Sequence, residues 1–198
     1  CFNGSFMVSH FIIRDDVRKH GSGNAGLTNF YRTYGAKYAL LVIACDMGKT
    51  VAACLLGSFF FRCLGWDGTL GTLLAGLGCE LGHIFPVFYG FRGGKGILSG
   101  GTLVLLLNWR VAAVAWALFL LLWLTTRYVS LASITATCSA PITVYFVYAH
   151  NWLYTGLCLA VAALVVWCHR ENIQRLLHGT EKKFKWHVNP MEGKDPPQ

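Results

Sequence analysis

The run VAAVAWALFLLLWLTT, residues 111–126, contains no charged side chain and is dense in Leu, Ala and Trp. A membrane-spanning helix needs about 20 mainly apolar residues, and fewer suffice when the helix packs inside a bundle. Five further apolar runs lie along the chain, at residues 38–57, 69–89, 97–108, 129–149 and 152–168. Together these runs predict an all-α fold, a polytopic membrane helix bundle.

The composition supports a membrane protein and excludes three other classes. Of the 198 residues, 55% are hydrophobic and 13% are charged, which is about half the charged share of a typical soluble domain. The chain is too apolar to be disordered and too poor in charge to cover a soluble enzyme. Its net charge is +8, but the basic residues lie between apolar runs rather than on a polar surface, so we expect no nucleic-acid partner.

The two ends of the chain differ from the apolar runs. Residues 1–13 are apolar but too short to span, and the chain begins with Cys, so we expect the end of a truncated first helix. A cleaved signal peptide is the alternative. Counting this helix, the bundle would have seven transmembrane helices. After residue 168 we expect a short interfacial helix, a single membrane domain that ends at residue 184, and a disordered cytoplasmic tail over residues 185–198.

The positions of Lys and Arg predict the orientation in the membrane. If the loop 14–37 is cytoplasmic and the sides alternate, fourteen basic residues lie on the cytoplasmic side and only Arg62 and Arg110 lie opposite. This excess follows the positive-inside rule. We therefore expect the polar loops and the C-terminus in the cytoplasm.

Three polar stretches fall on this side: RKHGSGNAGLTNFYRTYG (18–35), GHIFPVFYGFRGGKGILSGG (82–101) and HRENIQRLLHGTEKKF (169–184). The first contains a G-x-G-x-x-G pattern, but no apolar strand precedes it, which excludes a dinucleotide-binding fold. Its small residues let backbone amides face an anion, and polar side chains add further donors. These donors are Ser22, Asn24, Thr28, Asn29 and Arg32. A solvated basic loop is the alternative.

The second and third stretches also favour a phosphate. The turn Gly93-Gly94-Lys95-Gly96 opens a helix, where backbone amides and the Lys95 charge attract anions. It is one residue short of a P-loop, so we do not expect nucleotide hydrolysis, and an ordinary membrane anchor is the alternative for Lys95. His169 and Asn172 are three residues apart and would share a helix face.

Four ionisable residues lie within the apolar runs. Asp46 and Lys49 are one helical turn apart, and we expect them to satisfy each other in a structural pair. Glu80 and His83 have the same spacing and would form a similar pair, in which His83 already belongs to the second polar stretch and is the better site candidate. The eight cysteines include no C-x-x-C pair, and no metal-ligand pattern is present, so we expect no metal and no cofactor.

GSGNAGLTN, GHIFPVFYGFRGGKG and HRENIQRLL resemble the three signature motifs of the bacterial membrane acyl-phosphate:glycerol-3-phosphate acyltransferases (PlsY). The resemblance extends from about residue 3 to residue 181. It implies transfer of a fatty acyl group from acyl phosphate to the sn-1 hydroxyl of glycerol 3-phosphate, giving lysophosphatidic acid and phosphate, with no covalent enzyme intermediate. It also implies a multi-pass protein of the bacterial inner membrane, which we expect to be monomeric and surrounded by membrane lipid.

By motif position, the resemblance implies catalytic roles for Ser22, Lys95, His169 and Asn172. The expected phosphate-binding set is Ser22, Asn24, Thr28, Asn29, Arg32, Gly93, Gly94, Lys95, Gly96, His169 and Asn172, with His83, Asp46 and Lys49 in support. For His169, phosphate binding is favoured over a general-base role. A transporter of a phosphorylated solute and a non-catalytic lipid-binding scaffold are the alternatives. No internal similarity of two halves is present, which disfavours the transporter.

Overall fold

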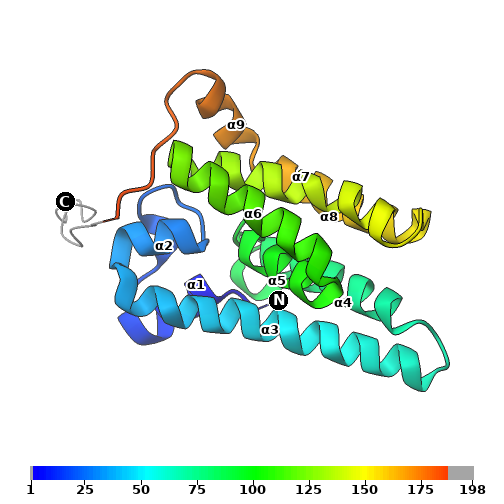
Figure 1. Cartoon of the computed structure of the whole chain (residues 1–198). Coiled ribbons are helices and arrows are strands. Elements are labelled where there is room, and N and C mark those ends of the chain that lie inside the picture. The colour runs from blue at the N-terminus through cyan, green and yellow to red at the C-terminus, as the bar shows by residue number, and fades with distance from the viewer. Residues whose placement is uncertain (1, 187–198) are drawn as a thin grey trace, which may run out of the picture.

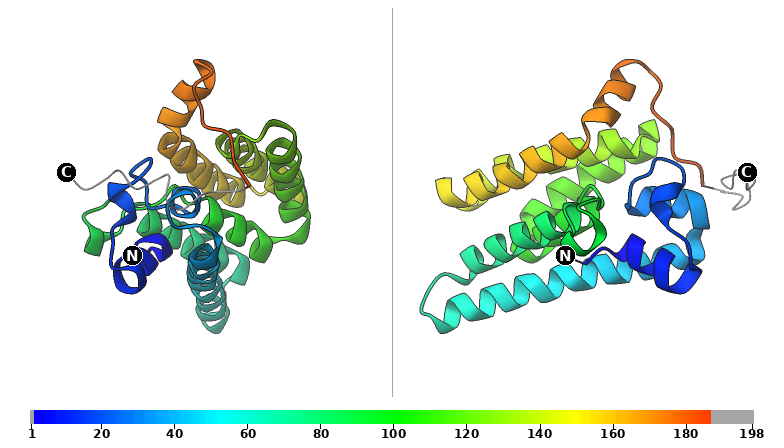
Figure 2. Two further views of the ribbon diagram at one scale, coloured as in Figure 1. Left: turned by 90° about the vertical axis from the view of Figure 1, so that its left-hand side faces the viewer. Right: turned by 180° about the vertical axis from the view of Figure 1, so that it is seen from behind.

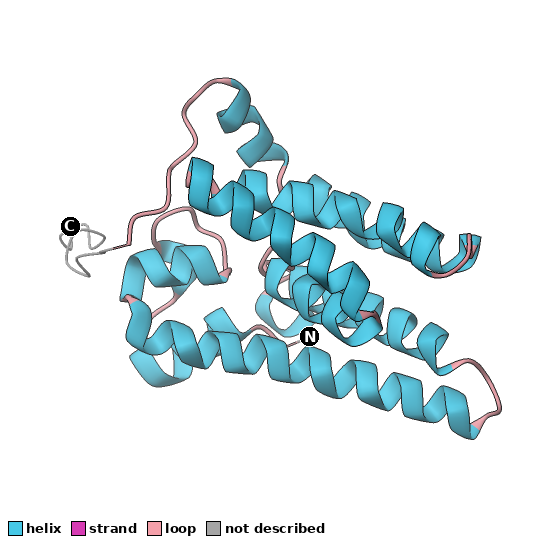
Figure 3. Cartoon of the chain, viewed as in Figure 1, coloured by secondary structure: helices cyan, strands magenta, loops and turns pink. Residues whose placement is uncertain are grey.

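The computed structural model describes residues 2–186, which form helices and loops with no strand among them (Figures 1 and 3). The elements in chain order are α1 (Gly4–Met7), η1 (Val8–Ile13), η2 (Val17–Lys19), α2 (Leu27–Tyr34), α3 (Ala36–Cys63), α4 (Gly68–Ile84), η3 (Val87–Tyr89), α5 (Ile97–Leu107), α6 (Trp109–Thr126), α7 (Val129–Val147), α8 (Trp152–Cys168) and α9 (Arg170–Leu177). The predicted all-α class is confirmed.

Four of the described helical segments are long and apolar enough to cross a membrane: α3, α4 extended to Tyr89, α6 and α7. The pair α8 and α9 makes a fifth candidate, bent by 60°. The helical segment Gly4–Ile13 and α5 are apolar but shorter. The integral membrane bundle is thus confirmed, while the count of seven crossings stays a prediction. The tail expected to be disordered lies, from residue 187 onward, outside the described residues.

Helix boundaries follow the capping residues. The side chains of Asp67, Asn108 and Asn151 accept hydrogen bonds from backbone amides in the first turns of α4, α6 and α8. Such caps satisfy amides that have no partner within the helix. The run 38–57 lies within α3, which has 28 residues and continues to Cys63. At 1.5 Å per residue, α3 is about 42 Å long and exceeds the thickness of the hydrocarbon core.

The bundle has two distinct ends. At one end, on the left and upper left in Figure 1, lie α2, the turn between α6 and α7, and α9. The turns that join α3 to α4 and α7 to α8 lie at the opposite end, as the reverse view in Figure 2 also shows. The first and third polar stretches therefore reach the same end of the bundle.

Close helix contacts hold this arrangement together. At Gly57 in α3 and Gly71 in α4, a Cβ on either residue would overlap the other's backbone, so the contact requires residues without side chains. Small residues at such crossings are typical of membrane helices. Near the opposite end of α3, Val17, Phe30 and Val42 are fully buried in one cluster. That cluster packs the first polar stretch against α3.

Candidate active site

Asn29 organises the first polar stretch. Its side-chain amide lies within hydrogen-bond distance of the carbonyl oxygens of three loop residues, and its oxygen accepts from the Ser22 amide at 2.9 Å. The three carbonyls are those of Val17 (3.2 Å), His20 (3.0 Å) and Asn24 (3.0 Å). Gly21 has φ +60°, and a Cβ there would overlap Asn29. Asn29 is buried, and its hydrogen bonds shape the loop.

The second polar stretch turns tightly against the end of α4. The amides of Gly93 and Gly94 donate to the carbonyls of Ile84 and His83, at 3.1 and 3.3 Å. These two amides are thus not free for an anion, contrary to what the Gly-rich pattern predicts. Gly96 has φ +83° and precedes α5, whose first-turn amides have no intrahelical acceptor. The amides of this stretch that have no backbone acceptor are therefore those at the start of α5.

The third stretch meets the second through Lys95. The Lys95 ammonium donates to the side-chain oxygen of Asn172. The Asn172 amide donates in turn to Glu181 at 2.7 Å, and Glu181 also accepts from Ser130 and Arg175, each at 2.7 Å. Burial acts to raise the pKa of Glu181, but these three hydrogen bonds outweigh it and lower the pKa. Glu181 thus anchors a network that fixes Asn172 beside Lys95.

His169 lies just beyond the last residue of α8 and is 3% exposed. Its Nδ1 is 2.8 Å from the Val165 carbonyl oxygen. Burial, together with the Lys95 charge, lowers the pKa of His169 to about 4. The imidazole is therefore neutral near pH 7. Since a carbonyl can only accept, Nδ1 carries the proton and Nε2 is left as an acceptor.

The three stretches converge. A Cβ placed on Gly94 would lie 3.0 Å from the Ala25 carbonyl oxygen, so the first and second stretches touch. Arg32 donates to the Lys182 carbonyl at 3.3 Å, which joins the first and third. Ser22 is exposed, while Asn24, Thr28 and Arg32 are half-buried. The predicted site residues of all three stretches therefore gather at one end of the bundle.

Of the two ionisable pairs predicted within the helices, the structure contains one and not the other. Lys49 donates to Asp46 at 2.7 Å, as the spacing predicts. The expected pair of Glu80 and His83 does not form. His83 is instead 2.6 Å from Lys49, and within residues 2–186 one carboxylate oxygen of Glu80 has no hydrogen-bond partner. Sequence spacing places Glu80 and His83 near each other on α4, but His83 turns toward α3.

Sequence reasoning missed Glu181, Ser130 and Arg175. Glu181 is an acidic residue directly before two lysines in what looks like a basic tail, and that change of sign is the only local signal. The chain also folds back after α9. Phe184 stacks on Tyr31 and contacts Trp123 edge-on, and its amide donates to the Arg127 carbonyl. We call residues 180–186 the C-terminal strap, since they connect α9 to α6 and α2.

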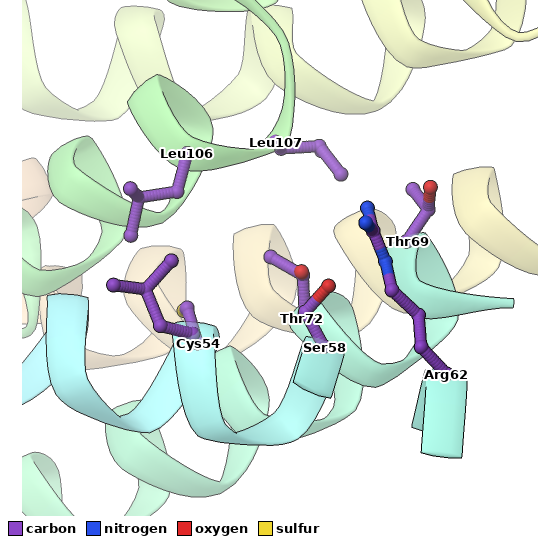
Figure 4. Close-up of a pocket in the computed structure, with 8 residues that line it drawn as sticks. Cys54, Ser58, Arg62, Thr69, Thr72, Leu106 and Leu107 are labelled. Carbon is purple, nitrogen blue, oxygen red and sulfur yellow. The ribbon is translucent and has the colours of Figure 1, made fainter. Parts of the chain in front are cut away.

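A pocket lies far from this site, between α3, α4 and α5 (Figure 4). It is lined by Cys54, Leu55, Ser58, Arg62, Thr69, Thr72, Leu106 and Leu107. Arg62 is one of the two basic residues expected on the side opposite the polar stretches. The pocket shares no residue with the candidate site. Among residues 2–186, no three His, Cys, Asp or Glu side chains group as metal ligands.

Fold and site together define a polytopic membrane protein with a cation-lined polar site at one end of its helix bundle. The glycerol-3-phosphate acyltransferase family model matches residues 1–179. A glycerol-3-phosphate acyltransferase of Syntrophomonas wolfei is 38% identical over 180 residues, which are 91% of this chain and 89% of that protein. One of Aquifex aeolicus is 41% identical over 170 residues, 85% of each chain. This chain belongs to the glycerol-3-phosphate acyltransferase family.

A solved structure agrees with this assignment. The glycerol 3-phosphate form of PlsY (YgiH), described as an integral membrane glycerol 3-phosphate acyltransferase, is 37% identical and superposes with a TM-score of 0.80. The match covers 92% of this chain and 90% of that one. A second structure, the lysophosphatidic acid form, has a TM-score of 0.77. The family and the bundle architecture thus agree.

Proposed function

We propose that this protein transfers a fatty acyl group from acyl phosphate to the sn-1 hydroxyl of glycerol 3-phosphate, releasing phosphate and lysophosphatidic acid. The observation that carries the proposal is the contact of Lys95 with Asn172, beside His169 and at the end of the bundle that holds Arg32. Cations at this position suit two phosphate-bearing substrates, while the bilayer delivers the acyl chain. The similar structures in glycerol 3-phosphate and lysophosphatidic acid forms support the same substrate and product.

The reaction balances without a covalent enzyme intermediate. The substrate hydroxyl oxygen bonds to the acyl carbonyl carbon, and the bond from that carbon to the phosphate oxygen breaks with its electron pair. The hydroxyl proton passes to His169 or to the departing phosphate. Because the mixed anhydride already has a good leaving group, positioning and charge stabilisation supply most of the catalysis. The proposal includes no metal and no other cofactor.

The proposed phosphate contacts come from side chains and from the start of α5. Lys95 and Arg32 supply positive charge, and Ser22 supplies a hydroxyl on the exposed loop. Burial, together with the nearby Arg175 guanidinium, lowers the pKa of Lys95, and an incoming phosphate relieves that unfavourable environment. Asn172 orients Lys95. Thr28 and Asn24 complete the first loop, and Gly93, Gly94 and Gly96 keep the turn free of side chains.

His169 is proposed to accept the hydrogen bond of the sn-1 hydroxyl. Nδ1 is held by the Val165 carbonyl, so the lone pair of Nε2 is available to orient the hydroxyl oxygen. This tautomer favours a proton-accepting role over the phosphate-binding role that the motif alone suggests, since a phosphate needs a donor. A pKa of about 4 makes the free imidazole a weak base, so the substrate phosphates must raise that pKa or take the proton themselves.

We further propose a bacterial inner-membrane location with the site and C-terminus in the cytoplasm, and a monomer with one domain to residue 184. The C-terminal strap supports including residues up to 184 in the domain because Phe184 packs on α2 and α6, and the packing continues to Trp186, which lies against Trp123. The charge distribution supports the orientation.

The deciding experiment is an acyl transfer assay in detergent or bilayer with glycerol 3-phosphate and either palmitoyl phosphate or palmitoyl-CoA. We expect lysophosphatidic acid with palmitoyl phosphate only. Absence of product from folded protein contradicts the proposal, and turnover with the CoA ester alone rejects the proposed donor. In sealed vesicles, uptake of glycerol 3-phosphate without product supports the transporter alternative.

A further inference from the structure

Lys49 uses its full donor capacity inside the bundle. Its ammonium lies 2.7 Å from Asp46 Oδ1, 2.8 Å from the Phe2 carbonyl oxygen and 2.6 Å from His83 Nδ1. An ammonium has three donors and no acceptor, so His83 Nδ1 must be the acceptor. The proton of the neutral imidazole is then on Nε2. The direct distance from His83 to Asp46, 3.6 Å, is too long for a hydrogen bond, which makes Lys49 the link between them.

The His83 ring packs against the turn of residues 93–96. A Cβ added to Gly94 would overlap Nε2 of His83, and it would also lie 3.0 Å from both His83 Cε1 and the Ala25 carbonyl oxygen. The Gly94 amide donates to the backbone carbonyl of the same histidine. Gly94 is therefore held between the His83 ring and the first polar stretch, next in sequence to Lys95.

Asp46 is connected to the first polar stretch as well. Its Oδ1 accepts from the Gly4 amide at 2.9 Å, and the neighbouring Asn3 donates to the Ala25 carbonyl at 3.1 Å. Asp46 and Asn3 are 2% and 0% exposed. This buried cluster is therefore connected to Ala25 through Asn3 and to Gly94 through His83. Ala25 and Gly94 lie where the two loops touch.

We infer that Asp46, Lys49 and His83 are positioning residues that set the relative placement of the two phosphate-binding loops, with His83 acting on Lys95 through Gly94. This inference rests on the proposed function for its consequence in catalysis. A pair of charges that only satisfied each other would need no third partner and no contact with the turn. His83 does not reach the substrate in this assignment, and its effect is transmitted by the backbone of residues 93–96.

The first test compares His83→Ala with Thr72→Ala in the full chain. Thr72 is also a buried polar residue of α4, bonded to the Gly68 carbonyl, and lies about 16 Å further along the helix. For His83→Ala we expect amide hydrogen exchange in residues 90–98 to accelerate about tenfold or more, and kcat/KM for glycerol 3-phosphate to fall about tenfold or more. Thr72→Ala should change neither. Wild-type exchange of this segment in folded His83→Ala overturns the inference.

A double-mutant cycle then asks whether His83 acts through Lys95. If it does, adding His83→Ala to Lys95→Ala should cost little further activity, since coupled residues are not additive. Fully additive losses overturn the inference and leave the three residues as a structural cluster. The residual activity of both backgrounds is measured at high enzyme concentration.

Two further variants, His83→Asn and Gly94→Ala, test the same contact if His83→Ala does not fold. If His83→Ala does not fold, His83→Asn retains an acceptor for Lys49 but lacks the ring atoms that reach Gly94, so exchange of the turn should still rise. Gly94→Ala should disturb the turn, and His83→Ala should relieve the part of that disturbance that comes from the His83 ring, while the contact with the Ala25 carbonyl oxygen remains. Hydrogen exchange needs no turnover, so a wild-type protein that is inactive refutes the proposed function while the positioning role is still read from exchange.

Discussion

Lys95 is the residue at which the second and third polar stretches meet, through the side-chain oxygen of Asn172. A hydrogen bond from a charged donor is worth about 1.5–3 kcal/mol. We therefore expect Lys95→Ala to lower kcat/KM for glycerol 3-phosphate by about 10- to 100-fold, and Lys95→Arg to recover only part of the loss. Arg110→Ala, at the opposite end of the bundle, is the control. Unchanged kinetics in Lys95→Ala would identify Lys95 as a membrane anchor.

The environment of His169 predicts how kcat/KM depends on pH. Its pKa of about 4 lies below the ordinary value of about 6.5, so falling pH protonates Nε2 and removes the acceptor only near pH 4. The substrate phosphates titrate in wild type and variant alike, so we consider the ratio of kcat/KM between wild type and His169→Asn. This ratio should stay constant from pH 8 to about 5 and fall below it. A fall between pH 7 and 6 contradicts the assigned environment.

Some of these residues could be predicted from sequence and others could not. Lys95, His169 and Asn172 stand out because their residue types and local spacing suit phosphate chemistry, and the structure brings them together. Glu181 could not be predicted, because its role depends on a chain that folds back onto α7 and α9. The predicted Glu80–His83 pair was wrong for a related reason: spacing fixes a helix face, but neighbouring helices decide which side chain finds a partner.

At the scale of elements, the loop before α2 depends on one side chain. Asn29 contacts three carbonyls and one amide, so Asn29→Ala removes all four of these contacts from the loop. We expect a loss of kcat/KM of about 10-fold or more, with the bundle still folded because its spanning helices are untouched. Thr33→Ala, on the same helix and bonded only to the Asn29 carbonyl, should have a much smaller effect. Equal effects of the two would show that α2 stability, not loop shape, controls activity.

The elements were predictable to the extent that apolar length defines them. The run 152–168 coincides with α8, whose start is capped by Asn151. The helix α2 was not predicted, since it has eight residues and a mixed composition. It exists because Phe30 is buried against Val17 and Val42, a contact between segments that local pattern does not reveal.

For the whole molecule, orientation can be tested with a native cysteine. Cys63 is exposed and ends α3, at the end of the bundle opposite the site. If the site is cytoplasmic, a membrane-impermeant maleimide should label Cys63 from outside intact cells, and Cys63→Ser should remove that labelling. Labelling of Cys63 that requires permeabilised cells would reverse the orientation.

The class of protein and the end that carries the site were predictable because they depend on summed properties, namely apolar length and the distribution of charge. The packing of helices was not, because it depends on pairs such as Gly57 and Gly71 that lie far apart in the chain. The C-terminal strap could not be predicted for the same reason, because it packs against Tyr31 and Trp123, which lie far from it in the chain.

The contact between Lys95 and Asn172 has a consequence for biosynthesis. The two residues are 77 positions apart, so a ribosome adding about 5–20 residues per second needs about 4–15 s to pass from one to the other. During that interval the nascent chain already carries both glycine-rich loops but lacks α9 and Glu181. The network around Glu181 forms last, so a chain still in the insertion machinery holds an incomplete site. The site is therefore complete only after Glu181 has been synthesised and has left the ribosome.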